Sequence, residues 1–135
     1  MASAEAVLEV LVPDAVALGG MTMGADPIAL ASAVVATERA RALRAFSIRK
    51  EAKDHGTGGR LVGPVEAGDR VALLDDTVST GSALFEALDV ARSEGLEIVQ
   101  AICLVDRSQG AVSARMAQVQ IPYVPLIDGT MLESR

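Results

Sequence analysis

One stretch, residues 71–84, constrains the fold of this chain more than any other. Four apolar residues, Val71 to Leu74, have the pattern of a buried strand, and two adjacent carboxylates, Asp75 and Asp76, follow them directly. A short run of hydroxyl residues with one glycine comes next, and a helix is predicted to begin at Ser82. Because unpaired carboxylates are costly beside an apolar core, this βα turn indicates a ligand site; a plain turn with helix-capping residues is the alternative.

Strand-like and helix-like segments alternate along the whole chain. The predicted strands span residues 15–18, 45–48, 70–74, 97–105 and 123–127, and the predicted helices span residues 4–12, 26–41, 82–94 and 111–120. Continuous apolar strands that alternate with helices are typical of an α/β fold with a Rossmann-like parallel sheet flanked by helices. The length of 135 residues predicts a single domain over residues 1–135.

Punctuating residues support these boundaries. Residues 19–24 are interpreted as a glycine-rich turn after the first strand. Asp26 is predicted as an N-cap with Pro27 at the first helical position, and Gly95 as the C-cap of the third helix.

The charge distribution narrows the class of ligand. A net charge of −6 argues against general nucleic-acid binding, which needs a basic face. The segment from Glu38 to Arg60 nevertheless carries seven basic and three acidic residues, so it is +4 while the rest of the chain is −10. Such a local excess suggests a small anionic ligand rather than a long polyanion.

The sequence shows no sign of a membrane helix or of a signal peptide. No apolar run approaches the ~20 residues of a membrane helix, and the N-terminus lacks the basic start of a signal peptide. We therefore expect a cytoplasmic protein without membrane partners. The single cysteine, Cys103, lies in an apolar run and is interpreted as a buried small residue rather than a nucleophile.

The chemistry-bearing residues follow the predicted strands, where open parallel sheets bind their ligands. Thr77, Ser79, Thr80 and Ser82 supply hydroxyl groups, Gly81 allows close approach of the backbone, and the next helix presents its N-terminus. Together these features predict a cradle for one phosphate group. The lysine of a nucleotide P-loop and a G-x-G-x-x-G pattern are both missing from the sequence. The vicinal carboxylates Asp75 and Asp76 suit the two hydroxyls of a ribose, directly or through hydrated magnesium.

Two further groups of residues extend this site. Arg49, Lys50, Lys53 and His55 lie in a charged, glycine-containing loop that could neutralise a pyrophosphate and close over a ligand. A solvated charged loop is the alternative. Arg107 follows another strand and could grip a planar carboxylate through two hydrogen bonds, or form a salt bridge to Asp106 or another surface acid.

These motifs carry a family resemblance. The stretch Val71 to Leu84 resembles the phosphoribosyl pyrophosphate (PRPP) signature of type I phosphoribosyltransferases, and Arg49 to Gly56 is similar to the R-K-x-x-K-x-H-G loop of orotate phosphoribosyltransferases. The stretches Gly20 to Pro27 and Val105 to Arg107 also fit that family. The resemblance implies Mg²⁺-dependent transfer of ribose 5-phosphate from PRPP to orotate, giving orotidine 5′-monophosphate and pyrophosphate in pyrimidine biosynthesis.

The resemblance also implies a role for each matching residue. Lys53, His55 and Asp76 would be catalytic, and Ser79 and Arg107 would contact orotate. The PRPP-binding set would be Arg49, Lys50, Lys53, His55, Asp75, Asp76, Thr77, Val78, Ser79, Thr80, Gly81, Ser82 and Ala83. Magnesium would be bound through PRPP, near Asp75 and Asp76, rather than by a set of protein ligands. A homodimer is implied, with the lysine–histidine loop serving the neighbouring subunit's site.

The N-terminal region departs from the family pattern. Members usually carry several dozen residues before the first core strand, forming a hood over the base, whereas at most Met1 to Asp14 precedes that strand here. Thr22 and Met23 also stand where some relatives have a Tyr-Lys pair. The chain is interpreted either as N-terminally truncated or as a short relative. A PRPP- or nucleotide-binding regulatory module, or an inactive fragment, is the alternative to the enzyme.

Overall fold

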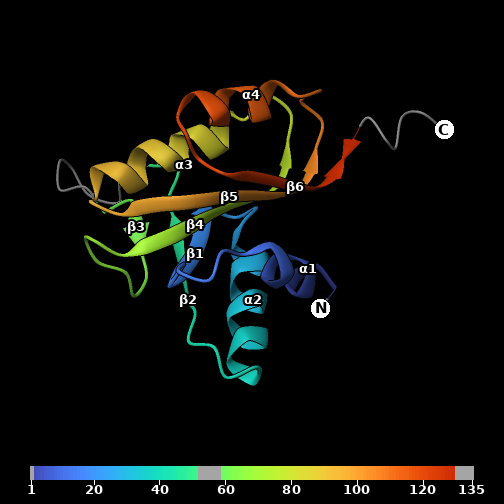
Figure 1. Cartoon of the computed structure of the whole chain (residues 1–135). Coiled ribbons are helices and arrows are strands. Elements are labelled where there is room, and N and C mark those ends of the chain that lie inside the picture. Colours follow the sequence, from blue (N-terminus) through green and yellow to red (C-terminus); the bar gives the residue numbers. More distant parts are fainter. Residues whose placement is uncertain (1, 52–58, 130–135) are drawn as a thin grey trace.

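The computed structural model describes residues 2–51 and 59–129. Its strands are β1 (Ala17–Met21), β2 (Arg44–Ile48), β3 (Leu61–Val62), β4 (Arg70–Val78), β5 (Glu97–Asp106) and β6 (Tyr123–Asp128). Its helices are α1 (Ala2–Val10), α2 (Asp26–Glu38), α3 (Ser82–Ser93) and α4 (Ala111–Gln118). The strands form one sheet in the order β3-β2-β1-β4-β5-β6, with α1 and α2 on one face and α3 and α4 on the other (Figure 1).

The predicted α/β class and parallel pairing are confirmed, with one exception at the edge. β1, β2, β4, β5 and β6 pair in parallel, but β3 pairs antiparallel to β2. β3 is not predicted from the sequence, because a strand of two residues at a sheet edge has no hydrophobic periodicity. It lies where the chain returns from the charged loop to the sheet.

Each face of the sheet has its own apolar core. Under α3 and α4, side chains such as Leu73, Leu88 and Met116 pack together. On the opposite face, Leu18, Leu74 and Ile102 pack against α1 and α2. Strands covered on both faces must be apolar at every position, which is why they read as continuous apolar runs rather than as alternating patterns. Among the described residues, no helix is long and apolar enough to span a bilayer.

The interpretation of residues 19–24 as a turn is wrong for its first part. β1 continues through Gly19 and Gly20 to Met21, and all five of its residues are buried. A Cβ atom on Gly19 would overlap the carbonyl oxygen of Phe46 in β2, and one on Gly20 would overlap that of Leu74 in β4. These glycines therefore serve close strand packing rather than a change of chain direction.

β4 also extends further than predicted. It was expected to end at Leu74, but it includes Asp75, Asp76 and Thr77 and ends at Val78. Pairing with β5 continues to this point, where Val78 stands opposite Asp106. Hydrogen bonds between neighbouring strands use backbone groups, so polar residues can also take part in strand pairing. The apolar pattern of the sequence therefore does not show where pairing ends.

Helix ends differ from the predictions by local geometry. Asp26 is the first residue of α2 rather than its N-cap, and its carboxylate accepts a hydrogen bond from the Thr22 hydroxyl at 2.6 Å. α2 ends at Glu38, because Ala40 has a φ of +60° and the chain turns away. The Gly95 prediction is confirmed: its φ is +86°, and the N–H groups of Gly95 and Leu96 close the end of α3.

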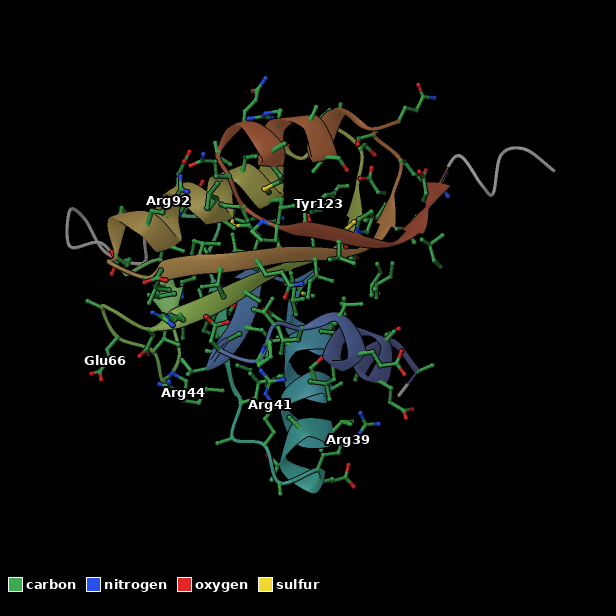
Figure 2. The ribbon with its side chains drawn as sticks, in the orientation of Figure 1. Arg39, Arg41, Arg44, Glu66, Arg92 and Tyr123 are labelled. Carbon is green, nitrogen blue, oxygen red and sulfur yellow. The ribbon has the colours of Figure 1, made fainter. Side chains whose placement is uncertain are left out.

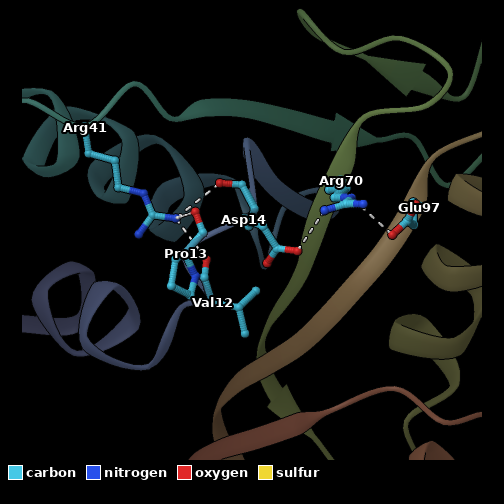
Figure 3. A network of polar contacts seen from close by, with 7 residues as sticks. Val12, Pro13, Asp14, Arg41, Arg70 and Glu97 are labelled. Carbon is cyan, nitrogen blue, oxygen red and sulfur yellow. Dashed lines mark hydrogen bonds and ion pairs between the residues drawn. The ribbon is translucent and has the colours of Figure 1, made fainter.

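Arginine side chains tie down the amino end of the sheet. Arg41 donates to the backbone carbonyls of Val12, Pro13 and Ala15, which form the connection into β1 (Figure 3). Nearby, Arg70 bridges Asp14 and Glu97, with 3.3 Å contacts to each (Figure 3). These contacts hold the end of the sheet opposite to the predicted ligand site.

Candidate active site

The two adjacent carboxylates lie at the carboxyl end of the central strand β4. Asp75 is half-buried and Asp76 is exposed. Asp75 accepts the N–H of Asp76 at 2.8 Å, and Asp76 accepts the N–H of Thr77 at 2.7 Å. These bonds use one oxygen of each carboxylate and orient both groups at the end of the strand.

Burial changes the acidity of one member of this pair. The pKa of Asp75 is raised from 3.8 to about 6, first because burial disfavours the charged form and then because of its hydrogen bond with Asp76. The nearby charge of Asp76 acts in the same direction. The neighbouring carboxylates of Asp75 and Asp76 are suited to a ligand that donates hydrogen bonds, such as the diol of a sugar.

Gly24 brings the chain after β1 against these carboxylates. A Cβ atom at Gly24 would stand 2.9 Å from Oδ1 of Asp76 and 3.4 Å from Oδ1 of Asp75. β1 lies between β2 and β4, so the chain order reverses direction there, and crevices of open α/β sheets form at such points. Gly24 belongs to the glycine-rich stretch 19–24, which does not have the G-x-G-x-x-G pattern of dinucleotide-binding turns.

The phosphate hollow, defined by Asp75 and residues 77–83, has a volume of about 230 Å³. Gly81 has a φ of +83°, a left-handed conformation that suits glycine, and it is the N-cap residue of α3. Thr80 accepts the N–H of Ser82 through its hydroxyl at 3.2 Å. A hydroxyl-rich loop at a helix N-terminus is suited to a phosphate group, as the sequence predicts.

A second hollow, the carboxylate pocket, adjoins the first and measures about 440 Å³. It shares Asp75, Thr77, Ser82 and Ala83 with the phosphate hollow. Its lining also includes Asp76 and Glu86 from the same two elements and, from two other segments, Lys50 and residues 21–24. The fold therefore places Lys50 in the lining of the same pocket as the carboxylates of Asp75 and Asp76.

Thr22, Met23 and Glu86 are lining residues that the predicted site set does not contain. The peptide bond between Thr22 and Met23 is cis. Met23 is highly exposed, with 75% of its surface accessible. The family resemblance marks Thr22 and Met23, at the place of a Tyr-Lys pair in some relatives, whereas nothing in the sequence marks Glu86.

The charged loop is closed at its base by two arginines. Arg49 and Arg60 pair through backbone bonds: the Arg49 N–H donates to the Arg60 carbonyl at 2.7 Å, and Arg60 Nε donates to the Arg49 carbonyl at 2.9 Å. Arg60 also forms an ion pair with Glu86 of α3, which anchors this base to the wall of the carboxylate pocket. Lys53 and His55 lie outside the described residues.

The basic segment from Glu38 to Arg60 is not one continuous patch. Arg39 pairs with Glu5 at 3.1 Å, Arg41 binds backbone carbonyls, and Arg44 pairs with Asp69 at 3.1 Å. These three side chains, labelled in Figure 2, bind other protein groups and do not belong to the lining of the carboxylate pocket. The excess of positive charge thus divides into a structural group and the residues at the start of the charged loop.

The structure brings the strand ends of Ser79 and Arg107 together. Ser79 follows Val78 at the end of β4, and the N–H of Arg107 donates to the Val78 carbonyl at 2.8 Å. Ser79 lines the phosphate hollow, while Arg107 is exposed and belongs to the lining of neither hollow. Asp106 is engaged by Ser108 and Tyr123, rather than by the Arg107 side chain as the alternative proposed.

The carboxylates of Asp75 and Asp76 are suited to a cation that is also coordinated by oxygens of a bound ligand. Carboxylate oxygens are ligands that magnesium prefers, and it usually keeps water or substrate oxygens as well. Within residues 2–51 and 59–129, no group of three or more His, Cys, Asp or Glu side chains could hold a metal alone. Asp75 and Asp76 could supply oxygens to a cation whose other ligands come from a phosphorylated compound and water.

Curated proteins related to this sequence have one name in common. The chain is 43% identical over 107 residues to the orotate phosphoribosyltransferase of Streptomyces avermitilis, covering 79% of this chain and 59% of that protein. It is also 43% identical over 98 residues to the orotate phosphoribosyltransferase of Aquifex aeolicus, covering 73% of this chain and 52% of that protein. The chain thus spans little more than half the length of these relatives. No family model matches it.

Solved structures agree with this result over a larger share of their chains. The Mycobacterium tuberculosis orotate phosphoribosyltransferase in complex with PRPP has a TM-score of 0.76 and 30% identity, covering 94% of this chain and 73% of that one. A phosphoribosyltransferase from Corynebacterium diphtheriae has a TM-score of 0.79 and 34% identity, covering 93% of this chain and 76% of that one.

Proposed function

This chain belongs to the orotate phosphoribosyltransferase family, and on that premise we propose that it transfers the 5-phosphoribosyl group of PRPP to a ring nitrogen of orotate. The products are orotidine 5′-monophosphate and pyrophosphate, which places the reaction in pyrimidine biosynthesis. The observation that carries the proposal is the pair of hollows sharing Asp75, Thr77, Ser82 and Ala83. One hollow suits a phosphate, and the other joins carboxylates to a lysine. The cytoplasmic location remains a prediction from the sequence.

We assign the parts of PRPP by chemistry. The 5-phosphate would lie in the phosphate hollow at the N-terminus of α3. Asp75 and Asp76 would accept the ribose hydroxyls. The pyrophosphate would extend into the carboxylate pocket toward Lys50, with Arg49, Lys53 and His55 of the same loop completing its neutralisation. Ser79 and Arg107 would hold orotate.

The reaction breaks the bond from ribose C1 to a pyrophosphate oxygen, whose electron pair leaves with pyrophosphate. A bond forms from C1 to the orotate nitrogen, whose proton passes to the departing pyrophosphate. The transition state resembles an oxocarbenium ion, so Asp76 is suited to stabilise the ribose while the cationic loop neutralises the leaving group. Closure of that loop would also exclude water, which would otherwise attack C1.

Magnesium is the metal that this chemistry favours. When bound to PRPP, it would neutralise pyrophosphate charge, and the oxygens of Asp75 and Asp76 would lie nearest to it. The protein supplies two carboxylates and leaves the other positions to PRPP and water, which agrees with the donor set described above.

A homodimer with the loop reaching the partner's site is part of the proposal. α2 and β3 present exposed apolar side chains, namely Leu30 (61% accessible), Val34 (57%) and Val62 (38%). A hollow of about 200 Å³ lies between them, lined also by Phe46. Because β2 and β3 lead directly into and out of the loop, a partner covering this apolar face would receive that loop nearby.

The first test is a spectrophotometric assay of orotate loss with PRPP and magnesium. Lys53→Ala is expected to lower turnover about 100-fold, because it removes a cation from the leaving group. Arg92→Ala, at an exposed position on α3, is the matched control and keeps full turnover. Equal rates for wild type and Lys53→Ala would contradict the leaving-group role.

PRPP binding is tested separately by calorimetry. Asp76→Asn is expected to weaken PRPP about tenfold or more, since a charged acceptor for the ribose hydroxyls is lost. Asp89→Asn, exposed on α3, serves as control. A wild type that binds PRPP but never consumes orotate would favour the regulatory module over the enzyme.

Mixing two impaired variants, at a PRPP concentration far below the KM of Asp76→Asn, tests whether the loop acts across the dimer. In a mixed dimer of Lys53→Ala and Asp76→Asn subunits, one site would contain both intact residues if the loop reaches the partner. An equal mixture should then recover about a quarter of wild-type activity after subunit exchange. No recovery, with exchange demonstrated independently, would show that the loop serves its own subunit.

A further inference from the structure

A buried carboxylate lies directly before the arginine proposed to bind orotate. Asp106 ends β5 and is only 4% accessible. Its Oδ2 accepts the Tyr123 hydroxyl at 2.8 Å, and its Oδ1 accepts the Ser108 N–H at 2.7 Å. Burial by itself would raise the pKa of Asp106, but the hydrogen bonds from Ser108 and Tyr123 hold that pKa below its ordinary value. The group is therefore an ionised and satisfied acceptor.

Tyr123 is held in place from a third side. It stands at the start of β6 on the α3 and α4 side of the sheet (Figure 2). Since its hydroxyl proton goes to Asp106, the hydroxyl oxygen accepts from the thiol of Cys103, with an Sγ to O distance of 3.0 Å. Cys103 is fully buried, as the sequence predicted. Cys103 in β5 thus contacts Tyr123 in β6, and Tyr123 in turn binds Asp106, the residue before Arg107.

The turn after Arg107 is fixed by the same group. Ser108, whose N–H is bound by Asp106, accepts the N–H of Val112 through its hydroxyl at 3.1 Å and that of Ala111 through its carbonyl at 3.2 Å. These bonds join the turn to the first residues of α4. Both neighbours of Arg107 are therefore immobilised by the buried carboxylate.

Gly129 limits the stem of Arg107. A Cβ atom on this buried glycine would stand 2.9 Å from Cγ of Arg107 and 2.9 Å from the carbonyl oxygen of Asp106. The chain after β6 can lie against the arginine only because residue 129 has no side chain. The Arg107 N–H also donates to the Val78 carbonyl. This bond and the packing against Gly129 together fix the position of the Arg107 side-chain stem relative to Ser79.

We propose that Tyr123, Asp106 and Gly129 position Arg107 for the carboxylate of orotate, an inference that rests on the proposed function. Bidentate recognition of a carboxylate depends on the plane and origin of the guanidinium, so a small displacement costs affinity. Tyr123 and Gly129 touch no substrate. They are positioning residues, and their effect should appear in orotate recognition rather than in PRPP binding.

The experiment compares steady-state constants of the full chain for both substrates. Tyr123→Phe removes only the hydroxyl, and we expect it to raise the KM for orotate about tenfold while the KM for PRPP changes less than about twofold. Gly129→Ala, which acts on Arg107 from the other side, should give the same split. Cys103→Ala is the control, because it removes the outer contact of Tyr123 and leaves both bonds of Asp106.

A second readout does not need activity. Hydrogen exchange of the Arg107 and Ser108 N–H groups, measured by NMR without ligands, should accelerate about tenfold in Tyr123→Phe and not in Cys103→Ala. A purely structural role would instead lower Tm and raise both KM values together.

The outcomes separate this inference from the function beneath it. A wild type that neither binds PRPP nor consumes orotate would overturn the proposed function, and the wild type alone decides that. An active wild type whose Tyr123→Phe and Gly129→Ala variants keep their KM for orotate would overturn the inference and leave the function standing. Unchanged exchange at Arg107 and Ser108 would overturn it as well.

Discussion

At Gly19 and Gly20 the sheet needs residues without side chains. β1 is the strand on which the two halves of the sheet meet, with β2 on one side and β4 on the other. A Cβ atom at either glycine would overlap a backbone carbonyl oxygen of the neighbouring strand. Backbone atoms cannot move aside as a flexible side-chain tip can, so the cost of a methyl group here is high.

Gly19→Ala is therefore expected to lower the free energy of unfolding by about 3 kcal/mol or more, through overpacking against β2. Urea denaturation followed by circular dichroism measures the change. Gly68→Ala is the control: its φ is +93°, but an added Cβ would meet nothing within 4 Å. It should cost only about 1–2 kcal/mol, from the left-handed backbone. Equal losses would refute the close-approach explanation.

Asp75 couples the site to stability through its proton. Folding raises its pKa from 3.8 to about 6, chiefly by burial. The folded protein then holds this proton more tightly than the unfolded chain does. The stability it contributes is full below pH 3.8 and is lost as the pH rises through 6. At neutral pH the ionised, half-buried group is a net cost to the fold.

Asp75→Asn should consequently stabilise the ligand-free protein at pH 7.5 by on the order of 1 kcal/mol, a value reduced for solvent screening of a half-buried group. The gain should shrink at pH 4.5, where wild-type Asp75 is protonated. Thermal unfolding of both proteins at the two pH values provides the measurement. Asp89→Asn should show no such pH-dependent gain, and a gain for Asp75→Asn that is the same at both pH values would contradict the burial argument.

Between elements, Gln100 connects β5 to the end of α1. Its side chain is 2% accessible. The carbonyl oxygen accepts the Val12 N–H at 2.9 Å, and the amide nitrogen donates to the Val10 carbonyl at 2.8 Å. α1 ends at Val10 rather than at Val12 as predicted, because Val12 gives its N–H to this glutamine and Pro13 follows. A polar residue inside a central strand thus satisfies a helix end.

Gln100→Leu should lower the free energy of unfolding by about 2–4 kcal/mol, since both backbone groups would lose their partner in a buried place. Chemical denaturation is the appropriate measurement. Gln118→Leu, at the exposed end of α4, should change stability by less than about 0.5 kcal/mol. If Gln100→Leu proved neutral or stabilising, water would be serving these groups instead.

For the whole molecule, the two apolar cores leave one face of α2 uncovered. Leu30, Val34 and Val62 are exposed apolar residues in a region that leads into the charged loop. A face of this kind is expected to be buried in an assembly. The proposed homodimer gives it an occupant and explains why it lies beside the loop.

Leu30→Glu is expected to raise the dimer dissociation constant about 100-fold or more, because it places a charge in an apolar contact. Sedimentation velocity across a concentration series would measure this constant. Val119→Glu, which is exposed on a different surface, is the control. A wild type that is monomeric at all concentrations, or an unaffected Leu30→Glu dimer, would contradict the proposed face.

Much of the fold and of the site could be predicted because it depends on local residue pattern. The strands and helices could be predicted from their apolar patterns, and the end of α3 from Gly95. The residues proposed to bind ribose 5-phosphate, Asp75 to Ser82, lie within a single turn of the sequence. β3 could not be predicted, since two residues have no period. Glu86 was missed because only the packing of α3 turns this exposed helix residue toward the carboxylate pocket.

The sequence by itself determined the order of the elements other than β3, the polar turn after β4 and the resemblance to the family. The tertiary structure decided which charges serve the site and which serve the fold. The basic segment illustrates this difference, because Arg41 and Arg44 bind protein groups while Lys50 reaches the pocket. The turn from Asp75 to Ser82 is local, and its chemistry can be read from adjacent residues. The groups around Arg107 come from separate segments: Val78 accepts its N–H, Gly129 lies against its stem, and Tyr123 binds the preceding Asp106. Only packing of the sheet brings them together.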